Sequence, residues 1–429
     1  MLRRIVVMML LAMAFVALAD PTPEQFKDDP LKQGGVLLGM PDPAIIQADD
    51  GSFYIFATGR GLPIYHSDNL VDWKRVGRVF DGAVPKWAAE RVPGTDGIWA
   101  PDIVKFNGVY FVYYCASTFG SQHSVIGVAK NKTLDINSPG YKWEDQGLVI
   151  ESFPEKDNFN AIDPAAFQQA DGRAFMVWGS YWTGIKSVEL NPETGKILSE
   201  EPVISPVASR PANGGAVEGA YMVKNGEFYY LFVSFDSCCD GAESTYRVMV
   251  GRSKQPLGPY SDWNETPMTN GGGTLVVRNN DNWRGTGHNS VLTTDKGSWL
   301  VHHTYDTFNL DKQRILQIRP LYWTDSGWPV AGEPLSRSNP MATEPADVNR
   351  GEIVGSWRIS KDYGTEIIYD LLPKGRIANN RGASWSLEGN VITIRLKDIA
   401  AKCIVEPLGT SFIGRDLEGA VIRGKQLPH

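Results

Sequence analysis

Three acidic side chains stand where they could act together in acid–base chemistry. Asp42 lies in PDPAIIQ, Asp163 in IDPAAFQ and Glu218 in VEGAYMV, and each opens a run of apolar residues. Carboxyl groups that share a confined, partly dry site repel one another, so one stays protonated while another ionises. Hydrolysis of a glycosidic bond needs that division between a general acid and a general base. We therefore expect a hydrolytic site if the fold brings the three residues together.

The local sequence around each acidic residue suits a different task. Asp42 lies between Pro41 and Pro43, which fix the backbone on both sides and suit a residue that must aim a water molecule. Asp163 repeats the Asp-Pro-Ala pattern. Glu218 is flanked by apolar and small residues, where desolvation is expected to raise its pKa toward the range of a general acid. An Asp-Pro turn that opens a strand, and a solvated glutamate at a strand end, are the structural alternatives.

These residues belong to a weak but consistent repeat of about 55 to 70 residues, somewhat longer than the usual period of propeller blades. Each unit opens with a polar anchor, and the anchors in order are Asp42, Asp102, Asp163, Glu218 and His288. A turn glycine and an aromatic-rich strand follow each anchor, the glycines being Gly51, Gly108, Gly172, Gly226 and Gly297. Third strands are predicted at SVIGVAK, GIKSVEL and YRVMVGRS, and outer strands at YKWEDQG, PYSDW and ILQIRPLYW.

Five copies of a four-stranded unit predict an all-β fold, a five-bladed β-propeller in which each blade buries its faces against its neighbours. Helical periodicity is scarce beyond the first residues of the chain. A two-sheet sandwich is the alternative, but it gives no reason for a polar residue to recur at the start of every unit. In a propeller the inner strands direct their ends into an axial well, so the acidic anchors are expected to converge there.

The two ends of the chain differ from the repeats in composition and sequence pattern. Residues 1–19 run from Arg3 and Arg4 through an apolar stretch to ALA, which predicts a signal peptide and a secreted or periplasmic protein. The stretch is too short for a membrane anchor; a lone membrane helix or a disordered start is the alternative. We expect the propeller over 20–342. A polar linker and short alternating runs predict a small β-barrel or sandwich over 343–429, which either packs against the propeller or binds glycans.

Composition narrows the classes of partner. The chain has 429 residues, 42% of them hydrophobic and 21% charged, as in ordinary globular proteins. The formal net charge of −7 disfavours nucleic acid and anionic membrane surfaces, and no obligate protein partner is evident. Four cysteines, Cys115, Cys238, Cys239 and Cys403, are too few for a disulfide scaffold, so any disulfide is expected to be accessory.

The segments PDPAII, WAPDI, STFGSQHSVIGVA, NAIDPAAF, WGSYWTGIK, AVEGAY, SFDSCCDG, STYRVMVGRS and GTGHNS together resemble glycoside hydrolase family 43. Within that family they are most similar to the secreted endo-1,5-α-L-arabinanases, over residues near 40 to 330. The resemblance implies that Asp42 is the general base, Glu218 the general acid, and Asp163 a residue that orients the acid and modulates its pKa. It also implies inversion of configuration, for which two carboxyl groups stand roughly 6.5 to 9.5 Å apart.

The same resemblance implies further site residues. Trp99, Phe119, Asn160 and Ser180 would line the sugar subsites, and His288 would hold a cation, expected to be Ca²⁺, in the axial well. From the residues alone His288 could be a core histidine, a proton donor or a metal ligand, and an axial position among carboxylates and water favours a hydrated Ca²⁺. Asp102, which follows WAP, is expected to be structural.

Two departures from the family pattern stand beside the catalytic positions. Pro41 precedes the base where the family commonly has histidine, and Gly219-Ala220 follows the acid where Ala-Pro or Gly-Pro is common. They affect expectations about substrate preference rather than about the reaction.

The leading functional prediction is an endo-acting hydrolase of α-1,5-linked arabinan. An exo-acting α-L-arabinofuranosidase or a β-xylosidase on the same scaffold is the enzymatic alternative. A non-catalytic glycan-binding propeller is the alternative from another class, because a fold does not dictate chemistry. The presence of all three acids counts against that last alternative.

Overall fold

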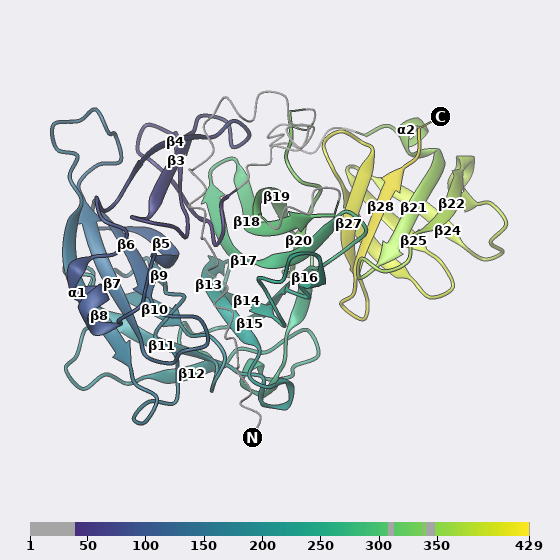
Figure 1. The fold of residues 1–429 in the computed structure, drawn as a ribbon. Coiled ribbons are helices and arrows are strands. Elements are labelled where there is room, and N and C mark those ends of the chain that lie inside the picture. The colour runs from purple at the N-terminus through teal and green to yellow at the C-terminus, as the bar shows by residue number, and fades with distance from the viewer. Residues whose placement is uncertain (1–38, 308–312, 338, 340–347, 429) are drawn as a thin grey trace, which may run out of the picture.

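The computed structural model describes residues 39–307, 313–337, 339 and 348–428. In this part of the chain, five four-stranded antiparallel sheets precede a closed barrel of eight strands. Figure 1 shows the sheets, coloured purple to green, grouped beside the yellow-green barrel. The predicted five-bladed propeller is confirmed, and the second domain is a barrel rather than a sandwich.

Each blade is built from four consecutive strands. Blade one contains β1 (Ala44–Gln47), β2 (Phe53–Phe56), β3 (Pro63–Ser67) and β4 (Lys74–Arg78). Blade two contains β5 (Trp99–Phe106), β6 (Val109–Ala116), β7 (Ser124–Asn131) and β8 (Glu144–Ser152). Blade three contains β9 (Ala165–Gln168), β10 (Ala174–Trp178), β11 (Ile185–Leu190) and β12 (Ser205–Ala208). Blade four contains β13 (Val217–Asn225), β14 (Phe228–Phe235), β15 (Arg247–Ser253) and β16 (Thr274–Val277). Blade five contains β17 (Trp283–Thr294), β18 (Gly297–Asp306), β19 (Ile315–Trp323) and β20 (Pro329–Ala331).

The barrel and the few helices complete the described elements. The barrel strands are β21 (Gly355–Lys361), β22 (Ile367–Leu372), β23 (Arg376–Ile377), β24 (Ser384–Glu388), β25 (Val391–Arg395), β26 (Ala400–Val405), β27 (Ser411–Asp416) and β28 (Val421–Gln426). The helices are α1 (Lys86–Arg91), α2 (Arg350–Ile353), and the 3₁₀ turns η3 (Pro211–Asn213), η4 (Gly241–Glu243), η5 (Met268–Asn270) and η6 (Pro373–Gly375).

The first hairpin of every blade turns at the glycine that the sequence predicts. All five glycines have positive φ, with values of 88° at Gly51, 82° at Gly108, 91° at Gly172, 57° at Gly226 and 140° at Gly297. A side chain with a Cβ rarely adopts such angles, so glycine at these positions lets the chain reverse without strain.

The predicted third strands agree with β7, β11 and β15, but two of the three predicted outer strands are wrong. PYSDW makes only isolated bridges through Ser261, to Arg252 and Pro267, and the outer strand of blade four is β16. ILQIRPLYW is β19, which pairs directly with β18 and is therefore a third strand. The outer strand of blade five is β20, which is so short that it leaves little pattern in the sequence.

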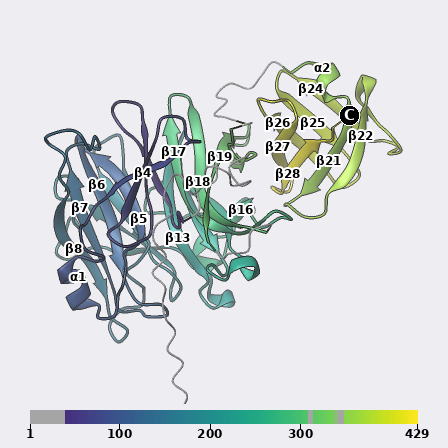
Figure 2. The ribbon, with the colours of Figure 1, turned by 45° about the horizontal axis from the view of Figure 1, so that its top comes forward.

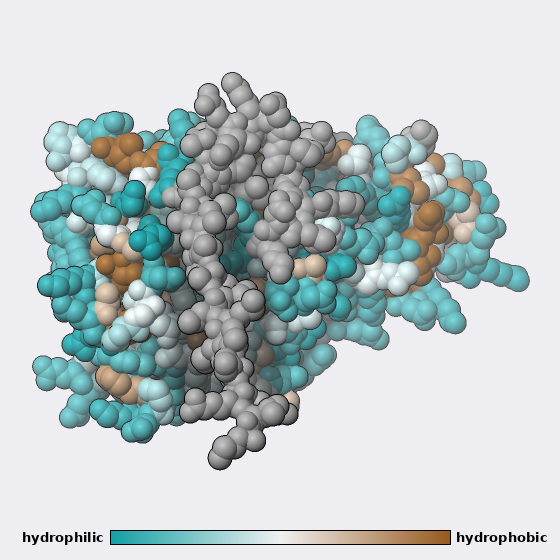
Figure 3. Space-filling model, in the orientation of Figure 1, coloured by the Kyte–Doolittle hydropathy of each residue, from teal (hydrophilic) through white to brown (hydrophobic). Residues whose placement is uncertain are grey.

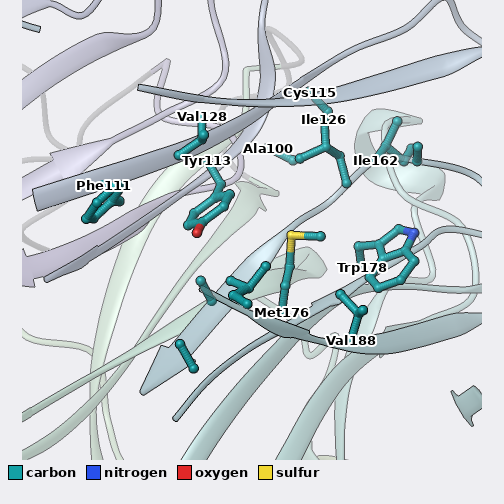
Figure 4. Close-up of a cluster of buried hydrophobic side chains, with 14 of the residues drawn as sticks. Ala100, Phe111, Tyr113, Cys115, Ile126, Val128, Ile162, Met176, Trp178 and Val188 are labelled. Atoms are coloured by element: carbon teal, nitrogen blue, oxygen red, sulfur yellow. The ribbon is translucent and has the colours of Figure 1, made fainter. Parts of the chain in front are cut away.

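Neighbouring blades are held together by large apolar side chains. Figure 4 shows the cluster between blades two and three, where Met176 and Trp178 lie opposite Tyr113, Ile126 and their neighbours. Trp178 and Tyr113 are fully buried. The face of the molecule in Figure 3 is mainly hydrophilic, with scattered apolar patches.

Blade five closes the ring against blade one by side-chain contacts, since each blade is built from strands that are consecutive in the chain. A shared apolar cluster joins the two, with Ile45 and Ile55 of blade one against Val301 and Ile318 of blade five. At the axis, Ser290 Oγ donates a hydrogen bond of 2.7 Å to the carbonyl oxygen of Pro43. The start of blade one is therefore fixed by blade five.

The barrel is docked on blades four and five: β27 contacts β20, and Figure 2 shows the barrel on the side of β16 and β19. Arg415 of β27 is buried and its guanidinium donates to the carbonyl oxygens of Leu275 and Pro329, at 2.7 Å each. Tyr363 Oη donates to the carbonyl oxygen of Val276 at 3.0 Å. Packing against the propeller, one of the two roles predicted for this domain, is thus observed.

The predicted limits of the domains fall partly on residues that the structure does not describe. The last propeller strand ends at Ala331 and the first barrel strand begins at Gly355. The predicted boundary at 342 and 343 and the predicted signal peptide over 1–19 lie outside the described residues.

Candidate active site

A pocket of about 790 Å³ gathers side chains from all five blades. All eight residues that the sequence predicts for the site line it: Asp42, Trp99, Phe119, Asn160, Asp163, Ser180, Glu218 and His288. The convergence expected of inner-strand ends in a propeller is therefore present.

In every blade, a residue in the left-handed region of the backbone lies just before the inner strand or within it. In blades one, three and five this residue is Asp42 (φ 53°), Asp163 (φ 56°) and His288 (φ 49°). Such values are uncommon outside glycine, although Asp and His adopt them more readily than most residues.

The other two blades depart from the shared position expected from the repeat. Their left-handed residues are Ala100 (φ 35°) and Gly219 (φ 56°). Glu218 therefore precedes the shared position by one residue, and Asp102 follows it by two. A Cβ on Gly219 would lie 3.2 Å from His288 Nδ1, so the close approach of blades four and five favours glycine there.

Asp42 is buried among cationic and hydrogen-bonding groups. Its Oδ1 lies 3.4 Å from Arg314 Nη1, 3.2 Å from His303 Nδ1 and 3.5 Å from His288 Nδ1. Thr58 Oγ1 donates to Oδ2 at 2.5 Å and itself accepts a hydrogen bond from the Ala100 backbone N–H at 2.7 Å. The carboxylate is thus held from blades one and five.

These partners keep Asp42 ionised. Burial on its own would raise the pKa of Asp42, but Arg314, then His288 and His303, outweigh burial and hold that pKa well below its usual range. Burial lowers the pKa of His303 to about 4 even beside this carboxylate. Asp42 is therefore equipped to accept a proton from water at neutral pH.

Asp163 has the opposite surroundings. Its Oδ2 accepts a hydrogen bond of 3.2 Å from the Gly219 backbone N–H, next to Glu218. Burial, and then the negative charges of Glu218 and Asp42, raise the pKa of Asp163 well above its usual range. Clustered carboxyl groups are expected to have pKa values that are pushed apart. Here the pKa of Asp163 is raised and the pKa of Asp42 is lowered.

Glu218 is oriented by two hydroxyl groups. Ser180 Oγ donates to Oε2 at 2.6 Å, and Tyr246 Oη donates to Oε1 at 2.9 Å. Its surroundings are therefore more polar than the apolar sequence around it predicts. Ser180, predicted to bind sugar, also holds this carboxyl group in place.

The predicted sugar-binding residues differ in exposure. The Phe119 side chain is 91% exposed on the pocket lining, whereas Trp99 is half-buried. Asn160 is buried, accepts a hydrogen bond from Ser124 Oγ at 2.7 Å, and donates from Nδ2 to the Ser121 carbonyl oxygen at 3.3 Å. Flat apolar faces and fixed amides are the groups that sugar rings and hydroxyls need.

Asp102 lies deeper in the fold and is not among the residues that line the pocket. It is buried and accepts a hydrogen bond of 2.6 Å from the backbone N–H of Ala166, on the inner strand of blade three. Burial raises its pKa to about 7. Its position fits the structural role expected from the sequence.

Sequence reasoning missed several residues of the site. Thr58, Arg314 and the disulfide between Cys238 and Cys239 line the pocket. Tyr246 bonds Glu218. The adjacent cysteines were a visible signal, although not for a position at the pocket wall. Arg314 and Tyr246 lie outside the motifs that contain the anchors, so their positions in the site follow only from the tertiary structure.

A propeller whose axial pocket gathers three carboxyl groups between aromatic walls has the features of a glycoside hydrolase. The family model for glycosyl hydrolases family 43 matches residues 36–329. The chain belongs to this family, and the resemblance seen in its motifs is confirmed.

Two curated relatives are named as enzymes of α-(1→5)-L-arabinofuranosyl bonds. The extracellular exo-α-(1→5)-L-arabinofuranosidase of Cellvibrio japonicus is 39% identical over 309 residues, 70% of this chain and 88% of the relative. The extracellular endo-α-(1→5)-L-arabinanase 1 of Bacillus subtilis is 39% identical over 293 residues, 67% of this chain and 86% of the relative.

Solved structures of arabinanases have the same fold as this chain. The Cellvibrio cellulosa α-L-arabinanase complexed with arabinohexaose has a TM-score of 0.66 and 38% identity, covering 69% of this chain and 96% of that chain. The endo-1,5-α-L-arabinanase of Thermotoga petrophila RKU-1 has a TM-score of 0.77, covering 91% of this chain and 99% of that chain; at 24% identity it shows a shared fold alone.

Asp163→Asn is expected to move the alkaline limb of the activity–pH profile to lower pH. In the protein as it stands, burial and the negative charge of Glu218 raise the pKa of Asp163, because losing this proton would leave two negative charges side by side, and that loss is delayed to higher pH. The amide removes one of those charges. Initial rates of glycoside hydrolysis across pH measure the limb.

Asp102→Asn is the matched control, because Asp102 is a buried aspartate outside the pocket lining. Its alkaline limb should stay where it is in the unmodified protein. An unchanged limb in Asp163→Asn would show that the proton of Asp163 does not shape the activity–pH profile.

Proposed function

We propose that this protein is an inverting glycoside hydrolase that cuts internal α-1,5-linked L-arabinofuranosyl bonds of arabinan. The observation that carries the proposal is the opposite electrostatic surroundings of Asp42 and Asp163 in one pocket with Glu218. The names of the curated relatives support α-1,5-arabinan as the substrate class.

In the proposed reaction Asp42 is the general base. Its ionised carboxylate takes a proton from a water molecule as that water attacks the anomeric carbon. Glu218, oriented by Ser180 and Tyr246, donates its proton to the leaving oxygen as the glycosidic bond breaks. Asp163 accepts a hydrogen bond from the Gly219 backbone N–H and so helps to position the neighbouring Glu218. Attack from the face opposite the leaving group inverts the anomeric carbon.

Internal cutting needs a site in which the substrate chain continues on both sides of the broken bond. Phe119 and Trp182, 91% and 41% exposed, offer apolar faces to sugar rings outside the deepest part of the pocket. An exo-acting α-L-arabinofuranosidase is the second candidate, because the Cellvibrio japonicus relative bears that name.

Brief digestion of debranched arabinan tests this proposal. An endo-acting enzyme is expected to release a ladder of oligosaccharides before monomer or a single short product accumulates. Chromatography of early products separates the two outcomes, and proton NMR of the fresh products reads the anomeric configuration. Release of one short product from the start would assign the exo-acting candidate instead.

Asp42→Asn and Glu218→Gln test the roles proposed for the general base and the general acid. Each is expected to lower kcat about a thousandfold, since acid–base catalysis contributes on that order. Retention of most of the rate in either variant would overturn the assigned roles.

We also propose that the protein is exported, to the cell exterior or the periplasm. The names of both curated relatives include the word extracellular. Among the described residues, no helix has the length and apolar character needed to cross a membrane. The sequence of residues 1–19 supports a cleaved leader. N-terminal sequencing of protein recovered outside the cytoplasm should begin at Asp20, and a start at Met1 would contradict cleavage.

A hydrated Ca²⁺ ion beside His288 is a further part of the proposal. Among the described residues, no group of three or more His, Cys, Asp or Glu side chains could hold a metal, so the donor set fits only an ion held mostly by water. His288 would be its protein ligand. Next to it Asn289 is buried with both amide atoms lacking a partner, as in a site that contains water. Such an ion would stabilise negative charge near the carboxylates.

Elemental analysis tests the cation directly. The purified protein is expected to carry about one calcium ion per chain, and His288→Ala close to none, because a site with one protein ligand loses its ion when that ligand is removed. Absence of calcium from the unmodified protein would remove the ion from the proposal.

A further inference from the structure

Two adjacent cysteines form part of the pocket wall. Cys238 and Cys239 are joined by a disulfide and both line the pocket. They follow strand β14 of blade four, and Cys239 is exposed while Cys238 is half-buried. The other two cysteines, Cys115 and Cys403, are free and buried, so with all four within the described residues this is the one disulfide of the chain.

The disulfide contacts a residue that faces the proposed base. Arg314 Nη1 lies 3.6 Å from Cys239 Sγ and 3.4 Å from Asp42 Oδ1. The Arg314 side chain is 24% exposed, and a long side chain at such a position loses conformational freedom only if its neighbours restrict it. The sulfur atom restricts Arg314 on one side and Asp42 attracts it on the other.

The loop that carries the disulfide is fixed at its base. Asp236 forms ion pairs with Arg210 at 2.6 Å and with Arg247 at 2.9 Å. The carbonyl oxygen of Ser237 accepts a hydrogen bond of 3.0 Å from the backbone N–H of Tyr246. Tyr246 also donates a hydrogen bond to Glu218, so the lower part of the loop is linked to Glu218. The disulfide at the tip of the loop is linked to Asp42 through Arg314.

The chemistry of the pocket wall differs between its two sides. Blades two and three contribute aromatic side chains, among them Trp99, Phe119 and Trp182. Blade five contributes the polar side chains of His288 and Arg314. A disulfide between adjacent residues closes an eight-membered ring, whose polarizable sulfur atoms and methylene groups have no strong hydrogen-bond donor. It therefore adds an apolar surface on the side where blades four and five meet.

We propose that the Cys238–Cys239 disulfide is a substrate-contacting wall of the site, which packs against the C–H face of an arabinofuranosyl ring and holds Arg314 beside Asp42. Two free thiols could not do both, since each side chain would rotate independently and present an S–H donor. The inference rests on the proposed function and extends it by assigning a binding and positioning role to residues outside the acidic trio.

The double variant Cys238→Ser/Cys239→Ser tests this role, because serine preserves size while removing the ring. KM for linear arabino-oligosaccharides is expected to rise about tenfold, the scale of one lost apolar contact in a binding pocket. We expect kcat to fall as well, since Arg314 loses its neighbour. A role confined to folding would lower the thermal midpoint and the fraction of active enzyme, and would leave KM unchanged.

Reduction of the unmodified enzyme gives an independent measurement. A phosphine and one water molecule convert the disulfide into two thiols and a phosphine oxide. This treatment should raise KM in the unmodified enzyme and leave the double-serine variant unaffected. Cys403→Ser, a free cysteine in the barrel, is the control and should retain the kinetics of the parent and its response to the phosphine.

The outcomes separate this inference from the proposed function. If the unmodified enzyme does not hydrolyse arabinan or arabino-oligosaccharides, the proposed function fails. If it does, and both the double-serine variant and the reduced enzyme keep the parent KM and kcat, the role of the disulfide is overturned. A variant that does not fold leaves the reduced enzyme to decide.

Discussion

Asp42, Asp163 and Glu218 crowd three carboxyl groups into one pocket, and their mutual repulsion sets what the rest of the site must supply. Arg314, His288 and His303 face Asp42 and hold it ionised. Asp163 has no comparable cation among the influences on its pKa, which burial and the other two carboxyl groups raise. Side chains of similar chemistry therefore acquire different protonation states from their neighbours alone.

The ring of blades delivers those neighbours from distant parts of the chain. Asp42 belongs to blade one, yet Arg314, His288 and His303, which lie beside its carboxylate, come from blade five, across the point where the ring closes. The closure itself depends on apolar packing and on the Ser290 hydrogen bond, so the electrostatics of the proposed base depend on the integrity of the core there. A loosened closure would move Arg314 and His303 away from Asp42 together.

The barrel extends this arrangement without lining the pocket. Arg415 and Tyr363 bond to backbone carbonyl groups of blades four and five, the blades that carry Glu218 and His288. Buried hydrogen bonds of this kind are costly to break, which makes the barrel a firm support for the side of the propeller on which it docks.

The sequence by itself determined the blade count, the glycine turns, the acidic trio and His288, because a repeat encodes the same local geometry each time it occurs. Asn160 and Ser180 followed only from the resemblance of the motifs to a known family. The sequence also placed the carboxyl groups together, since inner strands of a propeller have only the axis in common. It did not determine β16 and β20, the outer strands of blades four and five, because outer strands follow no anchor residue. Nor did it reveal that Glu218 stands one residue before the shared position. Only the tertiary structure brought Arg314, Thr58, Tyr246 and the Cys238–Cys239 disulfide to the carboxylates, because these contacts join blades across the ring and have no fixed spacing along the chain.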